Sequence, residues 1–203
     1  MSYIVQVKHP FPYLRIENLY STEELELIAQ ELDFLTYPDK LEGPLLTATA
    51  KDEDNNPLKE NRGLFLDEIY PKRNISNILK VNRKIFQSEY LDSFSDLCFG
   101  YQNIKRCNLD HTLINYYENG GYYKPHCDSF LYTAVTWFFR EPRLFEGGNF
   151  YFSDYNEKIQ IEHNMAVIFP SFVKHSVEEV KMMSDLPTGY GRYSMSQFID
   201  YVH

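Results

Sequence analysis

The chain has 203 residues, of which 43% are hydrophobic and 24% charged, so it is long enough for one well-packed domain. Its net charge of −9 argues against a general nucleic-acid binder, which needs a basic surface for the phosphates. The three cysteines have no CxxC spacing, which indicates a reducing compartment. Since no signal peptide and no apolar run of roughly 20 residues is present, the sequence predicts a cytoplasmic protein that does not bind membranes.

Most of the helical structure is predicted to lie in the first hundred residues. Ser21 and Glu24 form a capping box, which begins a helix over residues 22–35 with an apolar stripe at helical spacing. Turn formers and charges over 37–62 predict an exposed, mobile loop that is a candidate lid over a site. The other expected elements here are strands at 3–7, 13–16, 45–50 and 63–66 and a second helix at 75–97.

The second half reads as short strands separated by turn residues. Such spacing is typical of a sandwich or barrel, and helices that come before the strands are expected to pack on one side of it. No linker divides the chain, so we expect a single domain over 1–203, with helical, substrate-side elements in 1–100 and the β core in 101–200. The expected strands are 109–117, 131–139, 148–152, 158–161, 166–170, 175–180 and 190–199.

His126 and Asp128 lie in the stretch Tyr116 to Phe130 and bracket Cys127. Successive side chains of an extended segment point to opposite faces, so His126 and Asp128 project together while Cys127 points away and is expected to be a small buried hydrophobe. An imidazole and a carboxylate so placed can occupy neighbouring positions on one metal ion. Two His and one carboxylate form the facial triad of non-haem Fe(II) oxygenases, so the site needs a second histidine.

His175 is the predicted third ligand. It follows the apolar strand Met165 to Pro170 and begins His-Ser-Val, so it can reach the metal if its strand pairs with the strand of the first motif. The other histidines fit less well: His9 and His203 are terminal, and the remaining two lie at a strand start and in a polar turn.

Arg192, Ser194 and Ser196 alternate onto one face of the last strand. A guanidinium beside hydroxyl groups is well suited to a carboxylate, and a buried arginine without an acidic partner indicates an anionic ligand. The alternative, with about equal weight, is that Arg192 faces solvent or pairs with Glu178 or Glu179.

These elements resemble the prolyl 4-hydroxylase-like branch of the Fe(II)/2-oxoglutarate-dependent dioxygenases. The likeness covers five elements in the family's order: the motif around His126 and Asp128, the turn Glu146-Gly147-Gly148, the strand 166–170, the segment that begins at His175, and Gly191-Arg192-Tyr193-Ser194. Five elements in one order are far more specific than a lone His-x-Asp. The resemblance spans about residues 100–200 and implies a double-stranded β-helix, or jelly roll, with the N-terminal helices packed on one sheet.

The resemblance also implies cofactors and a reaction. His126, Asp128 and His175 would hold Fe(II), and Arg192 would bind 2-oxoglutarate, with Tyr117 and Ser194 as further contacts. With O2, and with ascorbate as a candidate reductant, such an enzyme hydroxylates a prolyl or other residue of a peptide or protein and releases succinate and CO2. Mn(II) and Co(II) would also fit the site.

Two features depart from the family and leave more than one interpretation open. The family's prolyl 4-hydroxylases often have a lysine where Asp185 stands here, and a turn-rich insertion over 183–189 would reconcile the spacing with Arg192. Residues 1–100 match no motif, so the substrate is open: a free amino acid or another small molecule would require a closed pocket with a second charged clamp. The chain could also be a cupin-like metalloprotein that uses no oxo acid, or a non-catalytic binding module.

Overall fold

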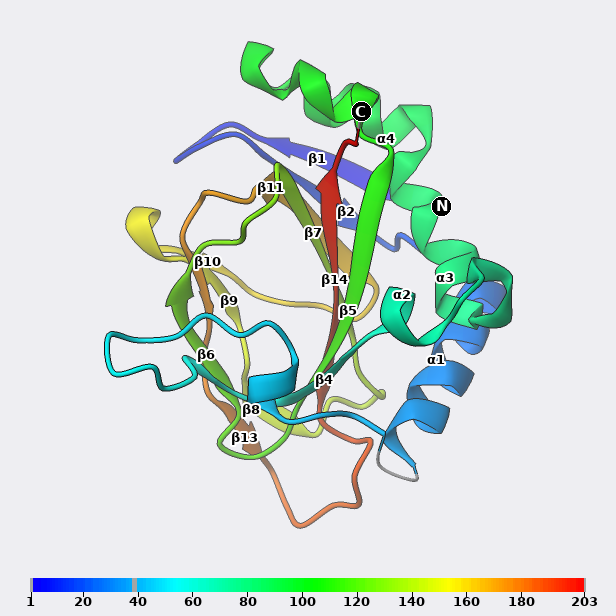
Figure 1. Ribbon diagram of the computed structural model, residues 1–203, viewed down its shortest axis with the longest axis vertical. Coiled ribbons are helices and arrows are strands. Elements are labelled where there is room, and N and C mark those ends of the chain that lie inside the picture. Colours follow the sequence, from blue (N-terminus) through cyan, green and yellow to red (C-terminus); the bar gives the residue numbers. More distant parts are fainter. Residues whose placement is uncertain (1, 38–39, 203) are drawn as a thin grey trace.

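The computed structural model describes residues 2–37 and 40–202, and within these the strands form two facing antiparallel sheets and a short hairpin-like pair (Figure 1). The larger sheet has the order β1 (Tyr3–Val7), β2 (Tyr13–Glu17), β11 (Met165–Pro170), β7 (Tyr132–Phe138), β14 (Arg192–Asp200), β5 (Leu109–Tyr117) and β4 (Arg62–Phe65). The smaller has the order β10 (Glu157–Ile159), β9 (Phe150–Phe152), β12 (His175–Val177), β6 (Tyr122–His126) and β3 (Lys59–Glu60). The pair is β13 (Val180–Met182) with β8 (Phe145–Gly147).

Both faces of the larger sheet are buried, and they belong to two different cores. Along β11, Ala166 and Ile168 pack in the core under the helices, whereas Val167 and Phe169 pack in the core between the sheets. This is the period of two that a strand imposes on its side chains. The helices lie on the side of the larger sheet away from β6, β9 and β10 (Figure 1). The prediction of a double-stranded β-helix with helices on one sheet is therefore confirmed.

The first helix is confirmed almost residue for residue. α1 spans Thr22–Thr36, and the capping box is present, because Glu24 N donates to Ser21 Oγ while the Glu24 carboxylate accepts from Ser21 N. Its buried stripe includes Ile28, Leu32 and Leu35. The remaining helical segments are short: η1 (Pro44–Leu46), α2 (Leu66–Ile69), η2 (Arg73–Ile75), α3 (Asn77–Val81), η3 (Asn82–Phe86), α4 (Ser88–Ser95), η4 (Phe99–Arg106) and η5 (Ser153–Tyr155).

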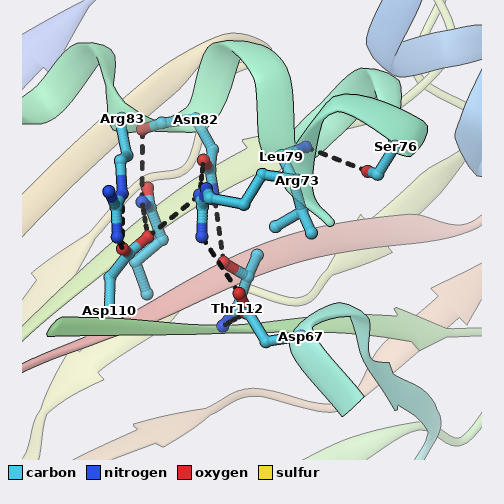
Figure 2. Close-up of polar contacts among 9 residues, drawn as sticks. Asp67, Arg73, Ser76, Leu79, Asn82, Arg83, Asp110 and Thr112 are labelled. Atoms are coloured by element: carbon cyan, nitrogen blue, oxygen red, sulfur yellow. Dashed lines mark hydrogen bonds and ion pairs between the residues drawn. The ribbon is translucent and has the colours of Figure 1, made fainter. Parts of the chain in front are cut away.

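The single helix predicted over 75–97 is wrong, because the chain breaks there into α3, η3 and α4. A polar network at the break ties the helical layer to β5, as Figure 2 shows. The buried carboxylate of Asp110 accepts from Arg73 Nη2 at 3.3 Å and from Arg83 Nη2 at 2.7 Å, and Asn82 Nδ2 donates to Thr112 Oγ1 at 2.8 Å. The Asn82 carbonyl accepts from the Gln197 side chain rather than continuing a helix. These contacts with β5 and β14 outweigh the local helical periodicity.

Two other local predictions need correction. The strand expected over 45–50 is wrong, because Pro44–Leu46 form the 3-10 turn η1 and the following residues form turns. The strand expected over 175–180 divides into β12 and the start of β13, which belong to different sheets. Residues 38 and 39 of the expected loop, and His203, lie outside the described residues. No helix in the described part of the chain is long and apolar enough to cross a membrane.

Candidate active site

The two predicted histidines are brought together by strand pairing. His126 ends β6, His175 begins β12, and the two are direct partners in the antiparallel register. Asp128 follows β6, with its Oδ1 3.8 Å from His126 Nε2 and its Oδ2 3.4 Å from His175 Nε2. The three ligand atoms lie within 4.8 Å of one another. Two ligands at right angles, each about 2.1 Å from a metal, lie about 3 Å apart, so this cluster can hold one ion on a single face.

The backbone sets both imidazoles in the tautomer that a metal requires. His126 Nδ1 is 2.9 Å from the carbonyl oxygen of Lys124, and His175 Nδ1 is 2.9 Å from that of Val173. A carbonyl can only accept, so each Nδ1 carries the proton and each Nε2 keeps its lone pair free. Burial, with a smaller contribution from His175, lowers the pKa of His126 to about 3, so this imidazole is neutral and competent as a ligand at neutral pH.

The Asp128 carboxylate is oriented by Thr133, a residue that was not predicted from the sequence. Thr133 Oγ1 donates to Asp128 Oδ2 at 2.7 Å and also lies 2.8 Å from Ser171 Oγ, and Asp128 N donates to the Ser171 carbonyl oxygen. Thr133 is 1% exposed. The sequence signal for it is weak, because the same largely apolar strand has a second threonine, Thr136.

The cluster opens into a cavity of about 390 Å³ between the two sheets. Arg192, Ser194 and Ser196 all line it, whereas Tyr193 and Met195 point into the helical core, so the predicted alternation on the last strand is observed. The alternative placement of Arg192 in solvent is excluded, because its side chain is fully buried.

Arg192 is a buried cation with unused hydrogen-bond donors. Nη1 lies 3.4 Å from Ser194 Oγ, whereas Nε and Nη2 have no hydrogen-bond partner within the described chain. Burial lowers the pKa of Arg192 to about 10, although the neighbouring Tyr117 raises it. The Tyr117 ring lies 4.7 Å from the guanidinium carbon and also lines the cavity. Orphaned donors of a buried guanidinium fit a carboxylate brought in by a ligand, as 2-oxoglutarate would bring.

Two glycines make room for this arrangement. A Cβ on Gly148, whose φ is +65°, would lie 2.9 Å from Arg192 Cδ, and a Cβ on Gly191 would lie 2.2 Å from the Tyr117 carbonyl oxygen. Arg192 can take its position only because the Glu-Gly-Gly turn and the residue before Arg192 have no side chain at these points. This gives a physical reason for these parts of the motif.

Two of the expectations from the sequence concern Cys127 and Asp185. Cys127 is exposed, so the expectation that it is buried is wrong, because it follows the end of β6 at the protein surface. Asp185 lies in the segment between β13 and β14, away from the cluster, which agrees with an insertion before Arg192.

Part of the cavity wall comes from the segment expected to be a lid, and it includes a lysine that was not predicted from the sequence. Residues 47–50 line the cavity, and Ala50 N donates to the Tyr123 hydroxyl at 3.1 Å. Lys59 on β3 also lines it and is only 2% exposed. The Tyr123 ring, which pairs with Lys59 across the sheet, stacks on His126 with 3.5 Å between centroids.

Comparisons with known proteins agree with this geometry. Residues 112–200 match the family model described as the 2OG-Fe(II) oxygenase superfamily. No curated protein matches the chain. Among solved structures, a Pseudomonas putida prolyl-4-hydroxylase is similar at 15% identity and a TM-score of 0.63, covering 93% of this chain and 92% of that one.

Two further structures show how widely this fold is used. The viral collagen prolyl hydroxylase of Paramecium Bursaria Chlorella virus-1, solved with 2OG, has 17% identity and a TM-score of 0.57, covering 94% of this chain and 96% of that one. NgTET1 in complex with 5mC DNA has 12% identity and a TM-score of 0.52, covering 93% of this chain and 72% of that one. At these identities the likeness shows the fold and leaves the substrate undetermined.

The family match covers the segments that carry His126, Asp128, His175 and Arg192, and the geometry of the cluster agrees with it. The match of residues 112–200 to the 2OG-Fe(II) oxygenase superfamily, together with the His-Asp-His cluster, indicates an oxidoreductase that uses Fe(II), 2-oxoglutarate and O2.

Proposed function

We propose that this enzyme is a hydroxylase in which His126, Asp128 and His175 hold Fe(II) and Arg192 holds 2-oxoglutarate. The observation that carries the proposal is that a buried guanidinium with two unpartnered nitrogens lines the same cavity as the His-Asp-His cluster. When bound, the iron and the oxo acid supply the oxidation: O2 and 2-oxoglutarate yield succinate and CO2, and one oxygen atom enters a substrate C–H bond.

The chain's own contribution is to orient these groups. The Lys124 and Val173 carbonyls hold the two imidazoles with Nε2 free, and Thr133 fixes the plane of the Asp128 carboxylate. Arg192 would grip the distal carboxylate of the oxo acid, with Ser194 and Tyr117 beside it.

Two substrate classes are candidates. Hydroxylation of a prolyl residue in a peptide or protein is supported by the likeness to two structures named as prolyl hydroxylases. Hydroxylation of a free amino acid or another small molecule is favoured by a second buried cation in the cavity, Lys59.

We also propose that residues 1–203 form one domain. In support of this, β3 and β4 from the N-terminal half pair with β6 and β5 from the C-terminal half. Residues of both halves line the cavity as well.

The test is an anaerobic titration of the Fe(II)-loaded protein with 2-oxoglutarate, which would give a weak visible charge-transfer band from the chelated oxo acid. We expect the band in the wild type and its loss in His175→Ala. His163→Gln is the matched control, because His163 is a half-buried histidine outside the cluster whose Nδ1 accepts from Phe139 N at 3.2 Å. A wild-type protein that binds iron but gives no band would overturn the proposal.

A further inference from the structure

Lys59 is a buried cation that the chemistry proposed above does not use. Its Nζ donates to the Thr47 carbonyl oxygen at 3.3 Å and lies 5.4 Å from the centre of the Tyr123 ring. In the described chain no carboxylate lies within 4.0 Å of this ammonium, which therefore has no ion-pair partner. An ammonium has three donors, and one long bond to a neutral carbonyl leaves the others unused.

This arrangement is energetically unfavourable unless a ligand completes it. Burial is the main influence on Lys59 and lowers its pKa to about 8, against a smaller opposing effect of Asp128. Burying a charge without a partner costs several kcal/mol, so a lysine kept in such a place indicates an anion that arrives with a ligand.

The charges of the cavity wall lead to the same conclusion. Two side-chain cations, Lys59 and Arg192, face a single carboxylate, that of Asp128. The two charges of Fe(II) are balanced by the two carboxylates of 2-oxoglutarate. One positive charge is then left over, and a carboxylate group of the substrate would pair with it.

Lys59 and Arg192 lie on opposite walls of the cavity. Arg192 is on β14 of the larger sheet, whereas Lys59 is on β3 at the edge of the smaller sheet. Lys59 pairs across the sheet with Tyr123, whose ring stacks on the metal-side His126, whereas the Arg192 guanidinium lies over the Tyr117 ring. Lys59 is thus placed to hold a molecule beside the metal rather than the far end of the cosubstrate.

We propose that the Lys59 ammonium binds a carboxylate of the substrate, so that the substrate is a small carboxylic acid such as a free amino acid. The inference rests on the proposed function and chooses between its two substrate classes. A residue inside a peptide chain carries no backbone carboxylate, whereas a free amino acid carries one close to the carbon to be hydroxylated.

The test uses the wild-type enzyme loaded anaerobically with Fe(II) and 2-oxoglutarate. The common L-amino acids are added one at a time, each beside its own carboxamide, together with the capped dipeptide-like probe N-acetyl-prolinamide. The readouts are the shift of the charge-transfer band and, after O2 is admitted, substrate-dependent succinate formation. We expect at least one free acid to shift the band and to support succinate formation. Its carboxamide should require an at least about tenfold higher concentration for the same effect.

Variants then assign the effect to Lys59. Lys59→Met should weaken the response to that acid at least about tenfold while the Kd for 2-oxoglutarate changes less than about twofold. Lys59→Arg keeps the charge and should retain part of the response. Lys158→Met is the matched control, because Lys158 is an exposed lysine on β10 of the same sheet and does not line the cavity.

Four outcomes would overturn the inference. In the first three, no free acid shifts the band or supports succinate formation, an acid and its carboxamide do so equally well, or only the capped probe does so. In the fourth, Lys59→Met weakens the binding of 2-oxoglutarate as much as it weakens the response to the acid. The acid–carboxamide comparison needs no variant, so it holds even if Lys59→Met fails to fold. Failure of the proposed function is distinguishable, because the wild type would then give no band with 2-oxoglutarate alone.

Discussion

Replacing Arg192 by Met should change cosubstrate binding and stability in opposite directions. Met keeps most of the length and packing of the side chain and removes the charge and its donors. In the folded protein this charge is fully buried, and Nε and Nη2 have no hydrogen-bond partner among the residues that the structure describes. A residue whose main task is to bind a ligand is expected to destabilise the protein without that ligand.

The magnitudes follow from this environment. Lost charge-assisted hydrogen bonds to a carboxylate are worth about 3 kcal/mol, which corresponds to roughly a hundredfold increase in the Kd for 2-oxoglutarate. Burial holds the pKa of Arg192 at about 10, which corresponds to about 3 kcal/mol against the charged form. The variant also loses the favourable contact with the Tyr117 ring, which lowers its stability by about 1–2 kcal/mol. The net result is that the metal-free variant should be more stable than the wild type by about 1–2 kcal/mol, or roughly 2–8 °C in Tm.

Two measurements check this: thermal unfolding of the metal-free protein and anaerobic titration of the charge-transfer band with 2-oxoglutarate. Arg140→Met is the control, because Arg140 is a partly exposed arginine paired with Asp33 at 2.7 Å. It should lose at most about 1 kcal/mol and leave the Kd unchanged. A lower Tm for Arg192→Met would show that the guanidinium is satisfied within the protein, and an unchanged Kd would show that it does not anchor the cosubstrate.

Three further predictions concern groups around the metal site. Thr133→Val should weaken Fe(II) binding about 10- to 100-fold in competition with a chelator, whereas Thr136→Val, which removes a buried hydroxyl that has no partner, should not weaken it. Gly148→Ala should lower the free energy of unfolding by about 2 kcal/mol and raise the Kd for 2-oxoglutarate, because its Cβ would lie 2.9 Å from the Cδ of the anchor arginine. Gly120→Ala, at a φ of +80°, should lower only the free energy of unfolding, because no described atom outside its chain neighbours lies within 4 Å of the added Cβ. Equal Kd values for 2-oxoglutarate in the two alanine variants would contradict the steric argument. In the metal-free protein, the free energy of unfolding measured in urea should fall by about 2 kcal/mol from neutral pH to pH 5. The reason is that His126 becomes protonated below about pH 6.5 in the unfolded chain, whereas its pKa of about 3 keeps it neutral in the folded protein. His126→Gln should reduce this pH dependence.

Local signals in the sequence were sufficient for several elements. The capping box and apolar stripe of α1 involve residues three or four apart, so they are readable without knowledge of the fold. The same is true of β5 and β14, whose alternation reveals which residues share a face. The helix predicted over 75–97 failed because Asn82 and Arg83 bond to β5 and end the helix for a reason that lies outside the local sequence.

The candidate site divides in a similar way. The spacing of His126 and Asp128 and the alternation of Arg192 with Ser194 were readable, because strand geometry alone places such pairs on one face. His175 could be named only as the best candidate, and the direct pairing of β12 with β6 is what brings it to the other two ligands.

What the sequence by itself determined is therefore the chemistry of each short segment: which residues can bind a metal, which can bind a carboxylate, and which faces are apolar. The tertiary structure alone decided the orienting bond from Thr133, the room that Gly148 leaves for Arg192, and the burial of Lys59 in the cavity. These features depend on contacts between segments far apart in the chain. The environment of a polar group, and hence whether it needs a ligand, is set by such contacts rather than by its neighbours in sequence.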